Sequence, residues 1–403
     1  MNGRQPVTSS ICQFAVVMIA GCLLIFVISG VASVLGESIS RDSSYRKLIF
    51  CDLENIPSSR WTKSVLFNSA GTRLYTFNLE EMSIYEFECS TRKLVRKFRF
   101  EPTQATGWDY DLNKPMPSFA EKPVEGCFSH DDRLLWVSLH NAGGIVAIPM
   151  DTVRTSDSLK TAIKPTTTSS RVLYIYDAEK KLTDTVRVPF IKTGKTPKVI
   201  TVTPDDRYLL VSNWHSNTVS VLRIQDSIAP YGRKVKDIRT GEYPRGIAVT
   251  GRPLKSYVTN MSSDVISVIN NKSWKIERQI RTIRNPRHVI ADSLGRLLIS
   301  YNTSSQIACV NAQNGRVLFR SPTSANPRTI AISKNKKFLF VACYEGNTLD
   351  VFKINKGSFT RIYSLVCPDK PVGVDLREDE QRLEAWVCTY EGEFLQVFSF
   401  IKE

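Results

Sequence analysis

Five basic residues recur at corresponding places in the sequence and could together bind an anion. Each follows a proline or threonine that opens an apolar run, and the last four recur at intervals of about 41–47 residues. The five are Lys63, Lys198, Arg245, Arg287 and Arg328. A guanidinium fork can bind a carboxylate or phosphate through two parallel hydrogen bonds. The recurrence predicts that one fold gathers these cations at a common anion-receiving mouth.

A second set of polar and aromatic residues follows the next apolar run of each repeat. The ligand-binding candidates in this set are Asn213, Trp214, His215, Asn260, Asn302, Tyr344 and Tyr390. Asn78 and His140 stand at the same place in two earlier repeats. Aromatic rings at a mouth could stack on a base or a sugar. Packing is the alternative interpretation, in which Arg stems cover apolar surface and the asparagines suit tight turns.

Motifs for other chemistry are incomplete. The sequence has no Gly-x-Ser-x-Gly, His-Glu-x-x-His, Gly-x-Gly-x-x-Gly or Cys-x-x-Cys. Lys195 and Thr196 imitate the end of a phosphate loop, but Pro189 stands where its first glycine is needed. Asp109 begins a calcium-like spacing in which Lys114 replaces the turn glycine. We therefore predict no catalytic residue, no metal site and no cofactor.

The repeats themselves predict the fold. Seven copies begin at Thr62, Pro123, Pro197, Pro244, Pro286, Pro327 and Pro371. The copy from Pro244 contains four strand-like runs, which are residues 246–250, 256–259, 264–269 and 275–280. Four-stranded units at a period of about 40–45 residues are typical of propeller blades. We predict an all-β, seven-bladed β-propeller over residues 46–403, whose last blade is closed by an N-terminal strand at residues 46–51.

Tyr257-Val258-Thr259-Asn260 reads YVTN, and the proline-led openings fit the same pattern. On these residues the chain resembles the YVTN-repeat β-propeller family over residues 46–403. The resemblance implies an extracytoplasmic surface or periplasmic protein, and some members are implicated in nucleic-acid binding. Propellers of similar architecture include lactonases and quinoprotein dehydrogenases. Two inserts, at residues 102–122 and 151–170, depart from the pattern and predict enlarged loops.

The N-terminus carries an uncharged apolar segment at residues 11–36, followed by a linker at residues 37–45. Its length suffices for a hydrophobic helix that spans a bilayer, which needs about 20 residues. A cleaved signal peptide, with small residues at Val31-Ala32-Ser33, and a lipoprotein acylated at Cys22 are the alternatives. All three place the rest of the chain outside the cytoplasm, and two of them keep it at a membrane.

Charge and cysteine content limit the class of partner. The formal net charge of +15 favours acidic partners in general. Of the nine cysteines, two lie in the apolar segment, and the rest lie mostly in strand-like runs, where we expect largely free thiols.

These observations predict a non-enzymatic binding propeller for an anionic ligand or a protein partner. A lactonase-like or other hydrolase and a nucleic-acid-binding propeller are the alternatives. A basic column argues against a hydrolase site that needs clustered carboxylates, and a steep salt dependence would distinguish nucleic-acid binding.

Overall fold

The computed structural model describes residues 45–109, 112–129, 131–151, 169–225, 229–292 and 294–403. These residues form β-strands and one 3-10 turn, η1 (Trp214–Ser216), so the all-β prediction is confirmed. The apolar segment at residues 11–36 lies outside the described residues. Within them, no helix is long and apolar enough to cross a membrane.

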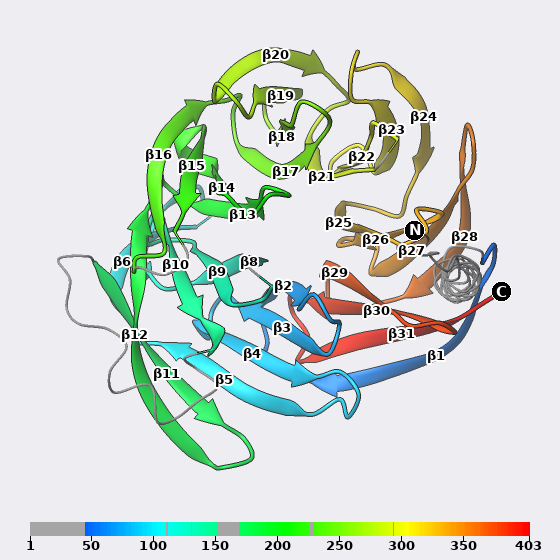
Figure 1. Cartoon of the computed structure of the whole chain (residues 1–403). Coiled ribbons are helices and arrows are strands. Elements are labelled where there is room, and N and C mark those ends of the chain that lie inside the picture. Colours follow the sequence, from blue (N-terminus) through cyan, green and yellow to red (C-terminus); the bar gives the residue numbers. More distant parts are fainter. Residues whose placement is uncertain (1–44, 110–111, 130, 152–168, 226–228, 293) are drawn as a thin grey trace, which may run out of the picture.

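In the described chain, seven innermost strands contact one another in sequence order and close a ring around a common axis (Figure 1). They are β2 (Thr62–Phe67), β8 (Pro123–Ser129), β13 (Pro197–Val202), β17 (Pro244–Thr250), β21 (Pro286–Ala291), β25 (Pro327–Ile332) and β29 (Pro371–Glu378). Each begins at one of the seven predicted repeat starts.

Each innermost strand pairs with an antiparallel second strand, which pairs with a third. The second strands are β3 (Arg73–Asn78), β9 (Leu134–Leu139), β14 (Tyr208–Asn213), β18 (Lys255–Asn260), β22 (Arg296–Tyr301), β26 (Phe338–Cys343) and β30 (Arg382–Thr389). The third strands are β4 (Ser83–Glu88), β10 (Gly144–Pro149), β15 (Thr218–Ile224), β19 (Val265–Asn270), β23 (Gln306–Asn311), β27 (Thr348–Ile354) and β31 (Phe394–Lys402).

The outermost strands complete these units of four. They are β5 (Leu94–Phe100), β12 (Leu182–Lys192), β16 (Gly232–Arg239), β20 (Lys275–Arg281), β24 (Val317–Pro322), β28 (Phe359–Val366) and β1 (Leu48–Pro57). The strands of the unit that begins at Pro244 match the predicted runs to within two residues.

The core lies between neighbouring units, because the preceding sheet covers one face of each sheet and the following sheet covers the other. The second strand β9 is therefore buried at every residue, and β14 is buried at all but its first. Between the units of β13 and β17, for example, Leu210 and Val221 pack against Val258 and Ile269. This explains why the second and third strands read as continuous apolar runs rather than alternating ones.

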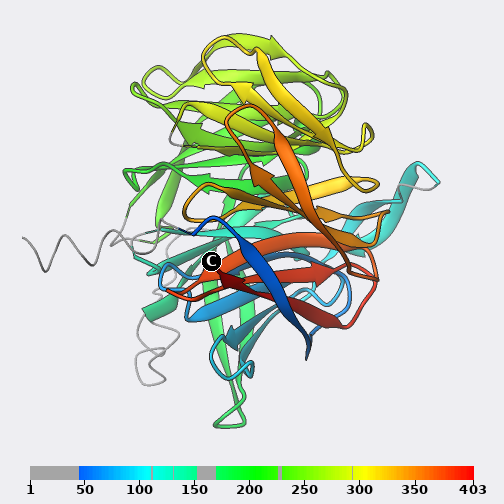
Figure 2. The ribbon, with the colours of Figure 1, turned by 90° about the vertical axis from the view of Figure 1, so that its right-hand side faces the viewer.

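The first predicted insert contains two strands, and the second ends where a strand begins. Residues 102–122 hold a hairpin of β6 (Gln104–Asp109) and β7 (Lys114–Phe119), which projects from one face of the ring in Figure 2. The second insert ends at β11 (Ser170–Asp177), which pairs with both β5 and β12 and joins two units into one nine-stranded sheet. The enlarged connection predicted at residues 102–122 is therefore an ordered hairpin, whereas residues 152–168 of the second insert lie outside the described residues.

The cysteines of the described region form no disulfide. Cys89, Cys309, Cys343, Cys367 and Cys388 are buried. Burial raises the pKa of Cys89 to about 11 and that of Cys388 to about 12, which keeps both thiols protonated at neutral pH.

The N-terminal strand closes the ring as predicted, although it extends beyond residue 51. β1 pairs antiparallel with β31 along its whole length, with a bulge between Phe50 and Asp52. Leu48 and Ile56 are buried, and the ring of Tyr45 stacks on that of Phe338 at 5.6 Å. β1 therefore covers an edge of β31 that would otherwise be open to pairing with another chain.

We predict that a chain beginning at residue 44 unfolds at the full-length temperature, whereas one beginning at residue 60 unfolds at a markedly lower temperature. The shorter chain loses the buried side chains of Leu48 and Ile56, which stabilise by about 1.5–3 kcal/mol each. Calorimetric melting of the two proteins checks this. Equal melting temperatures would show that strand closure contributes nothing.

Candidate functional site

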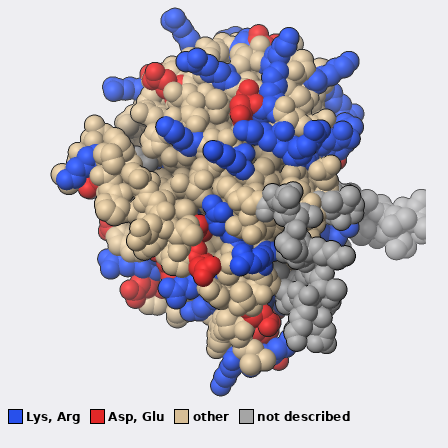
Figure 3. All heavy atoms as spheres, turned by 90° about the vertical axis from the view of Figure 1, so that its left-hand side faces the viewer, with Lys and Arg blue, Asp and Glu red and all other residues tan. Residues whose placement is uncertain are grey.

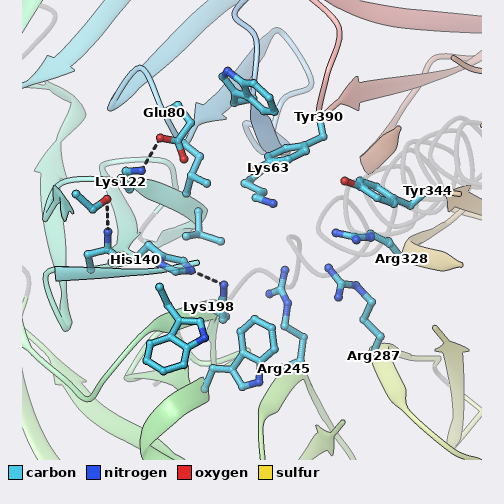
Figure 4. A pocket seen from close by; sticks show the side chains of 18 of the residues that line it. Lys63, Glu80, Lys122, His140, Lys198, Arg245, Arg287, Arg328, Tyr344 and Tyr390 are labelled. Atoms are coloured by element: carbon cyan, nitrogen blue, oxygen red, sulfur yellow. Dashed lines mark hydrogen bonds and ion pairs between the residues drawn. The ribbon is translucent and has the colours of Figure 1, made fainter. Parts of the chain in front are cut away.

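The five recurring cations line one cavity of about 990 Å³, at the end of the ring where the innermost strands begin. Figure 4 shows Lys63, Lys198, Arg245, Arg287 and Arg328 pointing toward the same central space from different units. The predicted gathering of these side chains is therefore observed.

A β-bulge at the start of each innermost strand positions this ring. The pairing register with the second strand shifts between Pro197 and Ile200, between Pro244 and Ile247, and at the same place in the other units. A bulge bends its strand and re-aims nearby side chains. Each of the five basic residues lies inside the shift, directly after the proline or, for Lys63, after Thr62.

A hydroxyl group of the second strand fills each of four consecutive bulges. The hydroxyls of Ser138, Ser212, Thr259 and Ser300 accept from backbone N–H groups of their own unit's innermost strand at 2.9–3.2 Å. The same hydroxyls donate to the backbone carbonyls of the next unit's basic residue, which are Lys198, Arg245, Arg287 and Arg328, at 2.7–2.9 Å. Neighbouring units are thus joined at the backbone of each of these cations.

Few carboxylates offset these charges. Arg245 forms an ion pair with Glu125 at 2.6 Å, whereas no ion pair within the described chain involves the other four cations. Three of those four lie over aromatic rings: Lys63 over Tyr390 at 3.7 Å, Lys198 over Trp214 at 4.4 Å and Arg328 over Tyr344 at 3.5 Å. A ring face attracts a cation without neutralising it.

Burial and mutual repulsion disfavour the charged forms. The pKa of Lys63 lies well below its usual value because of burial, with Arg328, Arg287 and Arg245 adding repulsion. Burial, Arg245 and Lys63 similarly lower the pKa of Lys198. Burial lowers the pKa of Arg328 to about 10, so this guanidinium stays charged at neutral pH. Burial, with Arg328 and Arg245, also lowers the pKa of Arg287. A bound anion would favour the charged forms of all these groups.

Lys198 is connected to a directed hydrogen-bond chain. Its Nζ lies 2.7 Å from His140 Nε2, and His140 Nδ1 lies 2.7 Å from Asn141 Oδ1. Asn141 Nδ2 donates to the backbone carbonyl of Phe119, which fixes the amide with Oδ1 toward the histidine. Oδ1 can only accept, so Nδ1 carries the proton and Nε2 accepts from Lys198. Burial and Lys198 lower the pKa of His140 and keep this imidazole neutral.

The second predicted set divides into two groups. Trp214, Asn302, Tyr344 and Tyr390 line the cavity, whereas Asn213, His215 and Asn260 do not. Asn213 and Asn260 are buried, and their amides donate within their own units, to Ser220 and Ser267 respectively. The ring of His215 stacks on Trp214 at 5.7 Å, and its Nδ1 lies 2.7 Å from Thr196 Oγ1. The packing interpretation therefore describes these three residues.

Other residues that line the cavity were not predicted from the sequence. The β6–β7 hairpin supplies Trp108, Met116 and Ser118, and the segment before β8 supplies Lys122, which pairs with Glu80 at 2.5 Å. The hairpin lies in an insert that no other repeat contains, so no alignment column could assign it. The extra length of residues 102–122 was the sequence signal that this segment could contribute to the site.

Many basic side chains lie elsewhere. Figure 3 shows Lys and Arg gathered on an outer side of the ring that includes β16 and β20. Arg233, Lys236 and Arg239 of β16 and Lys275 and Arg281 of β20 are exposed there. These solvated charges contribute to the net +15 without facing the cavity.

Comparison with solved structures identifies the architecture. Virginiamycin B lyase from Staphylococcus aureus has 12% sequence identity and a TM-score of 0.59, covering 87% of this chain and 99% of its own. A chain of Kuenenia stuttgartiensis hydrazine synthase has 14% identity and a TM-score of 0.59, covering 84% and 95%. The Cps50 (Swd1) β-propeller domain of Myceliophteria thermophila has 10% identity and a TM-score of 0.58, covering 86% and 99%.

The chain has a β-propeller fold. At these identities the likeness shows the fold alone. No protein-family model and no curated protein matches the sequence.

We predict that Thr259→Val destabilises the propeller by about 1–3 kcal/mol. Valine keeps the shape of the side chain but leaves the N–H of Gly246 and the carbonyl of Arg287 without this hydroxyl. The control is Thr250→Val on the neighbouring innermost strand, where the half-buried hydroxyl forms no hydrogen bond with described residues. Equal unfolding free energies for the two variants, from denaturant titration, would contradict the bridging role.

Proposed function

We propose that the cavity of this propeller binds a small anionic ligand. The observation that carries the proposal is five cations around one space, of which Glu125 neutralises only Arg245 among the described residues. Buried polar atoms support it: Arg245 Nη1 and Arg328 Nε have no hydrogen-bond partner within the described chain. An anion at the centre would satisfy these donors and reduce the repulsion.

The cavity also suggests the shape of the ligand. About 990 Å³ lies at the upper end of the usual range for small-molecule sites. Trp61, Trp214, Tyr344 and Tyr390 flank the cations. A compact polyanion with a planar or sugar body would place its charges on the arginines and its body on the rings.

A nucleic acid is the alternative ligand, and the exposed Lys and Arg side chains over β16 and β20 favour it (Figure 3). A backbone held along that outer side would bind with a steep salt dependence. The two proposals differ in the arginines that binding requires: those of the cavity for a small anion, and those of the outer side for a nucleic acid.

We further infer that the ring counts as seven blades, with two of them merged in the nine-stranded sheet, and that the chain is a member of the YVTN-repeat group. The roles of Thr259 and Asn260 support this membership, since one joins blades and the other fixes the turn after β18. An extracytoplasmic location, with residues 11–36 as membrane anchor or export signal, is part of the same proposal and depends on the sequence of that segment.

We predict that the double variant Arg287→Gln and Arg328→Gln weakens citrate binding by at least tenfold, which corresponds to about 1.4 kcal/mol. These two residues are chosen because replacing Arg245 would leave Glu125 unpaired. The control double variant, Arg239→Gln and Arg281→Gln, removes the same charge from the outer side and should change the dissociation constant by less than about threefold, since screening weakens distant charges.

Isothermal titration calorimetry at low salt measures both dissociation constants. Equal weakening by the two pairs would contradict a cavity site. Stronger dependence of single-stranded DNA binding on Arg239 and Arg281 would favour the nucleic-acid alternative.

A further inference from the structure

We propose that Lys198, His140 and Asn141 form a nucleophilic site that condenses with carbonyl compounds, preferring small 2-oxo acids, to give an imine at Lys198. The amine group lies at the wall of the cavity, 2.7 Å from a histidine that an amide orients in turn. A nucleophile, a base and an orienting group in hydrogen-bond reach are the usual arrangement for covalent catalysis. The preference for an acid depends on the proposed anion site, whereas imine formation itself does not.

The protonation state suits a nucleophile. An ammonium has no lone pair, and the lowered pKa of Lys198 increases the fraction of free amine at neutral pH. Arg245 is the charged group that lowers this pKa most, after burial, and its Nη1 has no hydrogen-bond partner within the described residues. A carboxylate bound there would present the adjacent carbonyl carbon to Lys198.

The condensation balances with groups in the cavity. The Lys198 nitrogen lone pair forms the C–N bond while the carbonyl π pair moves to oxygen. The two amine protons pass in turn through Nε2 of His140 to that oxygen. The oxygen leaves as water when the nitrogen lone pair forms the C=N bond. Asn141 is a positioning residue, since it holds the imidazole in the tautomer whose Nε2 accepts a proton.

The cavity provides an internal control. Lys63 is another lining lysine whose pKa burial lowers, and like Lys198 it lies over an aromatic ring, that of Tyr390. Among the described residues, no histidine forms a hydrogen bond with its Nζ. If burial alone made an amine reactive, both lysines would react alike. The proposal requires Lys198 to react faster, because within the described chain its amine has a histidine acceptor and that of Lys63 does not.

The experiment treats the folded protein with pyruvate and sodium cyanoborohydride at pH 7 and quantifies reduced adducts by peptide mass spectrometry. We expect modification at Lys198 at least tenfold faster than at Lys63 or the exposed Lys236. His140→Gln, with an unchanged melting temperature, should slow modification of Lys198 by at least tenfold. Lys198→Met should abolish the preferred adduct while leaving the surface adducts.

A parallel reaction with methyl pyruvate, which has the same 2-oxo group but no charge, separates the two proposals when each rate at Lys198 is divided by the rate at the exposed Lys236. Preference of Lys198 for pyruvate over methyl pyruvate on this scale supports both the nucleophilic site and the anion cavity. Equal relative modification of Lys198 by the two compounds keeps the nucleophilic site and contradicts the anion cavity. Modification of Lys198 no faster than Lys63, or undiminished in His140→Gln, overturns the inference.

Discussion

The arrangement of this molecule depends on a hydroxyl hydrogen bond that is repeated at four successive junctions between sheets. A Ser or Thr near the end of a second strand occupies the bulge of its own innermost strand and donates to a carbonyl in the next unit. A buried carbonyl without a partner would be costly, so the bond fixes how closely the two units approach. The acceptor carbonyl belongs in each case to a basic residue, and the same contact therefore fixes where that side chain begins.

Placing cations in this way creates an electrostatic cost that ion pairs among the described residues offset only at Arg245. Arg245 forms an ion pair with Glu125, whereas Lys63 and Arg328 lie over aromatic rings. Within the described chain, Arg287 forms no ion pair with a carboxylate. Hydrophobic packing between the units, with large side chains such as Trp136 and Trp386 fully buried, is extensive enough to sustain it. An unfavourable interaction that is concentrated at one cavity, and that packing elsewhere compensates, is typical of a functional site.

Periodicity predicted the parts of the structure that repeat. The strand positions of the unit that begins at Pro244 and the convergence of the basic residues both follow from one alignment. Thr259 was recognisable as part of a motif, but its role was not, because its acceptor is the carbonyl of Arg287 in the next repeat. The contact of Lys198 with His140 spans 58 residues and occurs once, so no spacing rule indicates it. The hairpin that supplies Trp108 lies in an insert, and β11 directly follows another, so alignment to other repeats gives no information on either.

Burial, reinforced by repulsion from the neighbouring arginines, lowers the pKa of the cavity lysines Lys63 and Lys198. A bound anion must then raise the pKa of Lys63 and Lys198, so binding takes up protons between their lowered values and their ordinary value of 10.5. Calorimetric titration with citrate at pH 8, in buffers of different ionisation enthalpy, measures the number of protons exchanged. We predict net proton uptake that is lost when Lys63 and Lys198 are both replaced by methionine. Binding of citrate with no proton uptake, or with uptake that persists in that variant, would contradict it.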